Sequence, residues 1–166
     1  MGPTTVTAPT VRIATRDDLD DLVGLGLGIQ ELHANGRPDL FRDPDPDALR
    51  EFLALKLSDE STVLIARDEG QALGYLLAEH TTRPANPFRR SSSSFYVHHI
   101  AVVATAQHKG VGKLLMDAAV KIAQDNGAAA IRLDSWQFNS QAHGFFESQG
   151  FAPVNVIFER TLTELS

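Results

Sequence analysis

Apolar and polar residues alternate along this chain with two different periods, and the change of period marks the strongest expected elements. Residues 95–103 repeat every two positions, which is typical of a strand. The residues after 110 repeat with helical spacing and end at Asn126-Gly127, a common helix stop. The apolar stripe of this helix consists of Val111, Leu114, Leu115, Ala118, Ala119, Ile122 and Ala123. The pattern predicts a strand that leads into a long amphipathic helix.

Weaker patterns predict the remaining elements. Further strands are expected at residues 11–15, 62–67, 72–79, 129–134 and 154–162, and further helices at 19–32, 47–57 and 139–148. Residues 80–94, with two prolines and four consecutive serines, are expected to form a long loop that covers a substrate site. The GLGLG run at 24–28 is interpreted as a loosened helix near a binding cleft, because a phosphate loop needs a preceding strand and a following lysine.

Length and composition limit the function classes. The 166 residues fit one α/β (α+β) domain with a mixed sheet, expected at 11–166 after an N-terminal tail at 1–10. The absence of cysteine excludes disulfides, thiolate metal sites and a cysteine nucleophile, and no metal site is expected. The first ten residues lack the features of a signal peptide, and no apolar run is long enough to span a bilayer. The sequence predicts a cytoplasmic protein without membrane attachment.

The charge pattern leaves the partner open. A net charge of −6 argues against nucleic-acid binding. The basic cluster of Arg83, Arg89 and Arg90 is interpreted as a solvated loop. The chain also has an acidic run, which consists of Asp39, Asp43, Asp45 and Asp47. This run either attracts a polyamine, aminoglycoside or basic peptide, or it only keeps the protein in solution.

The chemistry is expected where the strongest strand meets the strongest helix. A glycine turn before a helix N-terminus favours an anion, and Lys109 and Lys113 add positive charge. A P-loop is excluded, because Gln107 stands where its first glycine belongs and Leu114 follows the lysine. A dinucleotide-binding fingerprint, G-x-G-x-x-G, is excluded because Leu115 stands where its third glycine belongs. The remaining pattern, Q-x-x-G-x-G, is weak by itself.

Two longer segments resemble a known family. The run IAVVATAQHKGVGKLLMDAA at 100–119 resembles the acetyl-CoA signature of the GCN5-related N-acetyltransferases (GNAT), and WQFNSQAHGFFESQGF at 136–151 resembles their second conserved segment. The resemblance covers about residues 11–163. It implies a mixed, mostly antiparallel sheet of six to seven strands, with helices on both faces and a V-shaped splay between the central strands. It also implies acetyl-CoA-dependent transfer to a primary amine of a small molecule or peptide by direct attack in a ternary complex, and is compatible with a homodimer.

The resemblance also implies how the cofactor is held. The end of the strand at 95–103 would meet the pantetheine arm, the turn would meet the pyrophosphate, and the second segment would lie along the cofactor. The cofactor-binding residues expected on this basis are Ile100, Ala101, Val102, Val103, Gln107, His108, Lys109, Gly110, Val111, Gly112, Lys113, Asn139, Ala142, Phe145 and Phe146. The strands carrying Val102 and Leu133 would diverge around the thioester, and the backbone N–H near Val102 would stabilise the oxyanion.

Amine acetylation benefits from a base. An alkylamine with a pKa of about 10.4 is neutral only about one part in a thousand at pH 7. His98 is the first candidate, because histidine titrates near the working pH and strict alternation puts it on one strand face with Tyr96. Alternation turns His99 the other way, against a helix. The alternative catalytic residues are Glu79, His80 and Tyr96.

The sequence departs from the family at the position of the general acid. The family commonly has a tyrosine where this chain has Phe146, and a phenyl ring donates no proton. Either the CoA thiolate, with a pKa of about 8.5, leaves unprotonated, or Tyr96, Ser135 or a water molecule donates a proton to it. An alternative function is an acyl-CoA sensor or regulatory domain with little catalysis. A scaffold without ligand would leave the spacing of the glycine turn unexplained.

Overall fold

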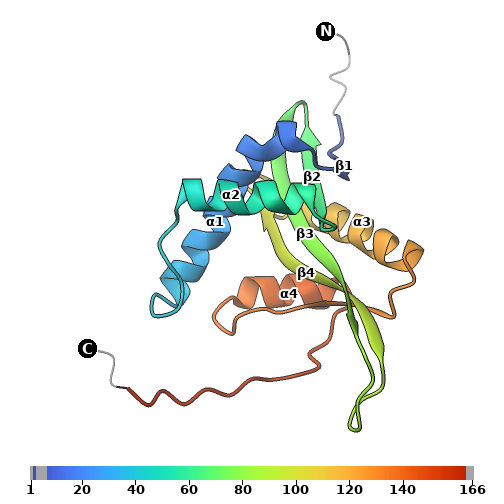
Figure 1. Cartoon of the computed structure of the whole chain (residues 1–166). Helices are drawn as coiled ribbons and strands as arrows, with labels where there is room; N and C mark the ends of the chain where they lie inside the picture. Colours follow the sequence, from blue (N-terminus) through green and yellow to red (C-terminus); the bar gives the residue numbers. More distant parts are fainter. Residues whose placement is uncertain (1, 3–6, 164–166) are drawn as a thin grey trace. The chain divides into compact units, whose positions relative to one another are not determined.

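The computed structural model describes residue 2 and residues 7–163, and it contains two compact units, Met1–Asp134 and Ser135–Ser166, which are described separately (Figure 1). The first contains β1 (Thr10–Ile13), η1 (Arg16–Asp18), α1 (Leu19–Gly36), α2 (Pro46–Ser58), β2 (Thr62–Asp68), β3 (Gln71–Arg83), β4 (Ser92–Val102), η2 (Ala104–Ala106), α3 (Val111–Asp125) and β5 (Ala130–Leu133). The second contains α4 (Ser140–Ser148). Residues 1 and 3–6 of the predicted tail lie outside the described residues, so the division into tail and single domain stays a prediction.

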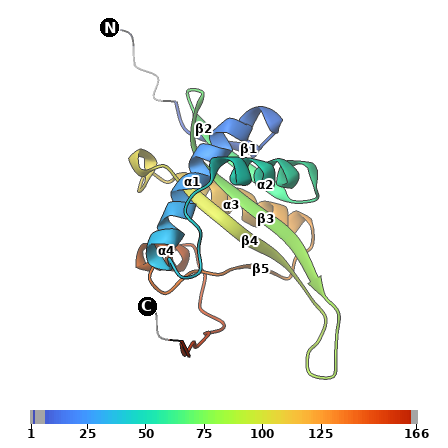
Figure 2. The ribbon, with the colours of Figure 1, turned by 60° about the vertical axis from the view of Figure 1, so that its left-hand side comes forward.

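The sheet of the first unit has the order β1-β2-β3-β4-β5. The first four strands are antiparallel, and β5 runs parallel to β4. α1 and α2 lie over one face and α3 over the other (Figure 2). The predicted mixed, mostly antiparallel sheet with helices on both faces is therefore confirmed.

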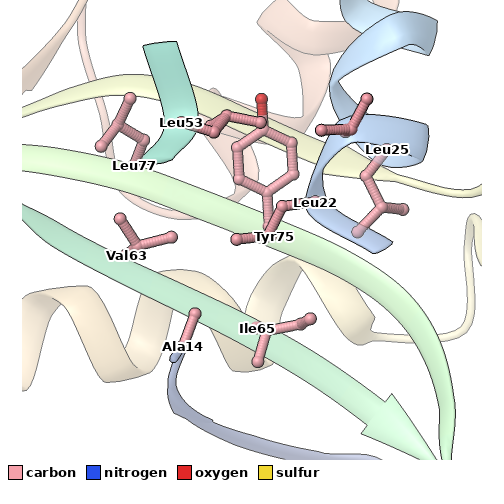
Figure 3. Close-up of a cluster of buried hydrophobic side chains, with 9 residues drawn as sticks. Ala14, Leu22, Leu25, Leu53, Val63, Ile65, Tyr75 and Leu77 are labelled. Atoms are coloured by element: carbon pink, nitrogen blue, oxygen red, sulfur yellow. The ribbon is translucent and has the colours of Figure 1, made fainter. Parts of the chain in front are cut away.

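Apolar residues on both sides of the sheet hold these layers together. On the α1 and α2 side, the wholly buried side chains include Leu22, Leu53 and Tyr75 (Figure 3). On the other side, Leu115 of α3 approaches Gly74 of β3, where an added Cβ would lie 3.2 Å from Leu115 Cδ1. α1 is continuous through residues 24–28, which agrees with the helical interpretation of the GLGLG run.

The strand count is five rather than six to seven, and the predicted strand at 154–162 is wrong for the described residues. The apolar residues Val154, Val156 and Phe158 alternate as they would in a strand. A strand, however, also needs a neighbour that completes its hydrogen bonds. No ladder involves this segment in the part of the chain that the structure describes.

The predicted loop at 80–94 is confirmed at residues 84–91 but is wrong at both of its ends, which belong to strands. Thr81–Arg83 pair with Ser92–Ser94, so only residues 84–91 connect β3 to β4. Thr81 Oγ1 and Ser94 Oγ share a hydrogen bond of 2.9 Å across the strands. The serines suggested a loop by composition, but hydroxyl pairs also stabilise paired strands. The result is a long hairpin that projects from the sheet (Figures 1 and 2).

A β-bulge interrupts the pairing of β3 with β4. Leu77 pairs with His99 and Ala78 with Val97, which leaves His98 as the extra residue. Such a bulge breaks the strict alternation of side chains. Paired residues share a face, so Tyr96, opposite Glu79, lies on the same face as His99. His98 therefore shares a face with Tyr96 as predicted, but the predicted position of His99 on the opposite face from Tyr96 is wrong.

Candidate active site

The glycine turn precedes α3 as predicted, and it leaves open space at the helix N-terminus. Gly110 is the N-cap residue and has a left-handed φ of 84°. A Cβ added to Gly110 would meet nothing within 4 Å. The first N–H groups of a helix have no partner within the helix, so they can receive an anion here. The turn therefore fits a pyrophosphate group.

The side chains of the turn differ in what they can contribute. Val111 is buried, which leaves only its backbone for a ligand. Lys109, His108 and Gln107 are exposed. Lys113 Nζ already pairs with Asp117 Oδ2 at 2.6 Å. We therefore expect the backbone around Gly110 to hold the ligand and Lys109 to add charge.

The end of β4 exposes backbone groups on the side of β5. Val103 N donates to Leu73 O at 2.8 Å, so these two residues form a hydrogen-bonded pair. Hydrogen-bonded and non-hydrogen-bonded pairs alternate along antiparallel strands, so the next pair, Val102 and Gly74, is a non-hydrogen-bonded one. The N–H and C=O of Val102 therefore point toward the β5 side. β5 pairs with β4 only as far as Val97, so no strand covers this edge near Val102 among the described residues. The Val102 carbonyl accepts from Gln107 Nε2 at 3.3 Å.

The other predicted cofactor residues lie apart from this edge or in the second unit. Ile100 shares the α3 face with Val102, whereas Ala101 and Val103 pack against the core on the α1 and α2 side. In the second unit, Asn139 caps α4 by accepting from Ala142 N at 3.3 Å. The rings of Phe145 and Phe146 lie 5.5 Å apart, centroid to centroid. These contacts explain Asn139 and the phenylalanines locally and leave their role toward a cofactor as a prediction.

The candidate base lies at the bulge and faces a carboxylate. His98 Nε2 is 3.2 Å from Glu79 Oε2. The other carboxylate oxygen, Oε1, accepts from Lys56 Nζ and, at 3.0 Å, from Ser61 Oγ. These two donors, with Lys56 first, lower the pKa of Glu79. Glu79 is therefore an ionised anchor that orients the imidazole of His98.

Tyr96 belongs to the same face and has a different partner. Its ring lies 5.0 Å from that of His98, and its hydroxyl donates to Asp134 Oδ2. Burial and then the hydrogen bond to Asp134 raise the pKa of Tyr96 to about 12. Tyr96 is therefore protonated near neutral pH and serves as a hydrogen-bond donor.

The candidate His80 and His99, the neighbour of His98, are separated from this cluster. His80 pairs with Phe95, and alternation along β3 puts it on the face opposite Glu79. His99 lies on the α1 and α2 face, where Tyr75 Oη is 3.0 Å from its Nδ1. Burial lowers the pKa of His99 to about 4, which keeps it neutral. His99 packs against a helix residue, Phe52, as expected.

Sequence reasoning missed Lys56, Ser61 and Asp134. Lys56 and Ser61 lie 23 and 18 positions before Glu79, and Asp134 lies 38 positions after Tyr96. Asp134 ends the predicted strand at 129–134, and a parallel neighbour of the strand at 95–103 would bring it near Tyr96. No comparable local signal marks Lys56, because its contact depends on how α2 packs on the sheet.

The sequence profile of the Acetyltransferase (GNAT) family matches residues 27–151. The chain belongs to this family. It is an acetyltransferase, as the sequence predicted. No group of three or more potential metal ligands gathers among the described residues. Within the same residues, none of the helices is long and apolar enough to cross a membrane.

Two curated relatives of this GNAT chain are acetyltransferases. The uncharacterised N-acetyltransferase YhfO of Bacillus subtilis (strain 168) is 29% identical over 108 residues, which are 64% of this chain and 70% of that protein. The mycothiol acetyltransferase of Propionibacterium freudenreichii is 31% identical over 139 residues, which are 84% of this chain but 41% of that protein. This chain thus spans less than half the length of the second relative.

Solved structures support the GNAT fold. A mutant of the BH1408 protein from Bacillus halodurans has a TM-score of 0.85 and 27% identity, covering 93% of this chain and 99% of that chain. An aminoglycoside N-acetyltransferase in complex with CoA has a TM-score of 0.73 and 22% identity, covering 94% of this chain and 96% of that chain. The acceptor and the catalytic residues stay predictions.

Proposed function

We propose that this enzyme transfers the acetyl group of acetyl-CoA to a primary amine of a small molecule or peptide, by direct attack in a ternary complex, with His98 as the general base. The observation that carries the proposal is the contact between His98 Nε2 and Glu79 Oε2 at the β4 bulge. A histidine whose ring is oriented by a carboxylate is a common arrangement for proton abstraction. Bulges are frequent next to active sites, where they re-aim a side chain.

The environments of the other candidates favour His98 over them. The lowered pKa of Glu79 makes its carboxylate a weaker base, and Lys56 occupies one of its oxygens. The raised pKa of Tyr96 keeps its proton in place. His80 lies on the other face of β3. His98 is thus the group of the cluster that remains for the role of base.

The proposed binding of the acyl donor rests on the glycine turn before α3 and on Val102. The backbone N–H groups at the start of α3 would hold the pyrophosphate of acetyl-CoA, with Lys109 beside them. The Val102 N–H, on the uncovered edge of β4, would donate to the thioester oxygen as negative charge develops there. Acetyl-CoA supplies the activated acyl group.

Tyr96 is not proposed as the acid for the leaving group. Its proton is already donated to Asp134, and its raised pKa makes it a weaker acid than a free phenol. We therefore assign Tyr96 a positioning role beside His98. Release of the thiol without a side-chain acid, or with a proton from water, fits Phe146 in the family's tyrosine position.

The names of similar proteins support an amine acceptor. One is a mycothiol acetyltransferase and another an aminoglycoside N-acetyltransferase. The cytoplasmic location and the homodimer stay predictions from the sequence.

A screen of amines tests the proposal. Thiol release from acetyl-CoA would be measured with aminoglycosides, polyamines and short peptides, and the acetylated product identified by mass spectrometry. We expect amine-dependent thiol release together with an acetylated amine. If acetyl-CoA raises the unfolding temperature but no amine accelerates thiol release, the acyl-CoA sensor becomes the better account.

A further inference from the structure

Four arginines gather where the β3–β4 hairpin meets β5. They line a hollow of about 390 Å³ together with Pro84, Asn86, Phe88 and Ser92. The four are Arg83, Arg89, Arg90 and Arg132. Arg89 and Arg90 belong to the turn at 84–91, and Arg132 belongs to β5. The sequence suggested only a solvated loop here, because Arg132 is distant from the others along the chain.

Like Arg16, Arg42 and Arg160, the arginines of the hollow form no ion pair among the described residues, whereas four other arginines pair with carboxylates. Arg12 pairs with Asp18, Arg37 with Asp39, Arg50 with Asp20, and Arg67 with Asp18 and Asp21. In a chain of net charge −6, four guanidinium groups without carboxylate partners around one hollow favour an anionic ligand.

The hollow continues from the candidate base along the same sheet face. Arg132 is the direct partner of Tyr96 in the parallel ladder, so the two share a face. Arg83 follows Glu79 by four residues on β3, an even spacing that keeps it on the face of Glu79 and spans about 13 Å. A molecule with its amine at His98 can therefore reach the arginines with its other end.

The acidic run at residues 39–47 supports a cationic acceptor less well than the arginines support an anionic one. Asp39 is paired with Arg37, and the Asp45 side chain caps α2 by accepting from Asp47 N and Ala48 N. These two carboxylates already have local functions.

We propose that the acceptor of this enzyme is an anionic amine, whose carboxylate or phosphate groups bind in the hollow lined by Arg83, Arg89, Arg90 and Arg132. The proposal rests on the proposed function, because it takes His98 as the place of the amine. Guanidinium groups bind carboxylates and phosphates in a bidentate manner. Phe88, which is 93% exposed and lines the same hollow, provides an apolar contact for an organic acceptor.

Binding and turnover of matched peptides test this assignment. Peptides with the same free amine would end in three Asp, three Asn or three Arg residues, and a further amine of equal length would end in a phosphate ester. Their dissociation constants would be measured by calorimetry without acetyl-CoA, for the wild type, Arg83→Gln/Arg132→Gln and Arg16→Gln. Arg16 is an exposed arginine next to β1, the opposite edge of the sheet, and serves as the matched control.

We expect at least one anionic probe to bind the wild type and Arg16→Gln equally well, and the double variant roughly tenfold or more weakly. Preference for the Asp peptide or for the phosphate ester identifies the source of the anion. The proposal would be overturned if the Asp and Asn peptides bound equally well and the phosphate ester did not bind. It would also be overturned if the double variant and Arg16→Gln lost affinity for the anionic probes equally.

A parallel measurement separates this proposal from the proposed function. His98→Gln should bind the anionic probe as the wild type does but lose its acetylation. If the probe binds in the hollow and is not acetylated by the wild type, the function proposed for His98 fails while the anion site stands. If amines are acetylated without any preference for anionic ones, the enzyme activity stands and the hollow is not the acceptor site.

Discussion

Glu79 and His98 face each other from β3 and β4, with Oε2 of the carboxylate 3.2 Å from Nε2 of the imidazole, although they lie 19 positions apart. The bulge that makes His98 the extra residue of β4 places its ring beside Glu79. Lys56 and Ser61 hold the second carboxylate oxygen. The catalytic proposal therefore depends on one backbone irregularity and one anchored carboxylate.

Replacing the carboxylate tests whether Glu79 positions the base. We expect Glu79→Gln to lower kcat roughly tenfold or more, because the imidazole loses its orienting partner, while KM for acetyl-CoA stays unchanged. Steady-state thiol release measures both constants. Lys56→Gln is the comparison: it loosens the carboxylate but leaves the contact of Oε2 with His98, so it should lower kcat less than Glu79→Gln does. Equal losses of kcat in both variants would indicate a merely structural role for this cluster.

The cofactor turn can be blocked at Gly110. Gly110→Glu adds bulk and negative charge to the pyrophosphate position, so acetyl-CoA should no longer raise the unfolding temperature. Gly127→Glu is a matched control at the other end of α3, because Gly127 has a φ of 70° and its Cβ would also meet open space. Both variants carry similar backbone strain. A cofactor-induced rise that survives in Gly110→Glu would place the cofactor elsewhere.

Close packing at Gly74 predicts a stability loss. A Cβ at this position would lie 2.5 Å from the carbonyl oxygen of Ala101 on the neighbouring strand. Gly74→Ala should therefore reduce the free energy of unfolding by about 1–3 kcal/mol. Gly28→Ala, at an exposed helical position with open space, should increase it by up to about 1 kcal/mol. Urea titrations measure both, and a neutral Gly74→Ala would contradict the observed strand packing.

The buried histidine predicts a loss of stability in mild acid. Between pH 6.5 and 4 the unfolded chain binds a proton at His99 that the folded chain excludes, so the free energy of unfolding falls as the pH is lowered. A pKa of about 4 corresponds to a loss of up to about 3 kcal/mol. Burial lowers the pKa of His33 in the same direction. Asp18 and Glu79, whose pKa values are also lowered, add a further loss of stability as the pH falls through their ordinary values of 3.8 and 4.5.

Urea titrations at several pH values check this effect. His99→Gln should flatten the dependence between pH 6.5 and 4 more than His33→Gln does. An unchanged dependence in His99→Gln would show that the imidazole is not held neutral in the folded protein.

Local patterns were sufficient for the elements whose signals lie within one segment. The stripe from Val111 to Ala123 predicted α3, and the spacing of Gln107, Gly110 and Gly112 predicted the turn before it. Both depend on neighbours a few positions apart, which a sequence displays directly. The first candidate base, His98, was selected from the same strand and lies beside another candidate, Glu79.

Features that depend on partners distant in sequence could not be predicted. A bulge arises from the register of two strands, so alternation gave His98 and His99 opposite faces. Pairing of Thr81 with Ser94 turned an expected loop into a hairpin. The lack of a ladder partner left Val154 and its neighbours outside the sheet of the described residues.

The most direct test of the central claim is the rate of amine-dependent thiol release from acetyl-CoA in His98→Gln, compared with wild type and with His80→Gln. We predict that His98→Gln lowers kcat by roughly 100-fold or more while acetyl-CoA still raises its unfolding temperature. His80→Gln, on the opposite face of β3, should retain the wild-type rate. A wild-type rate in His98→Gln would contradict the assignment of His98 as the base and return the role to another group.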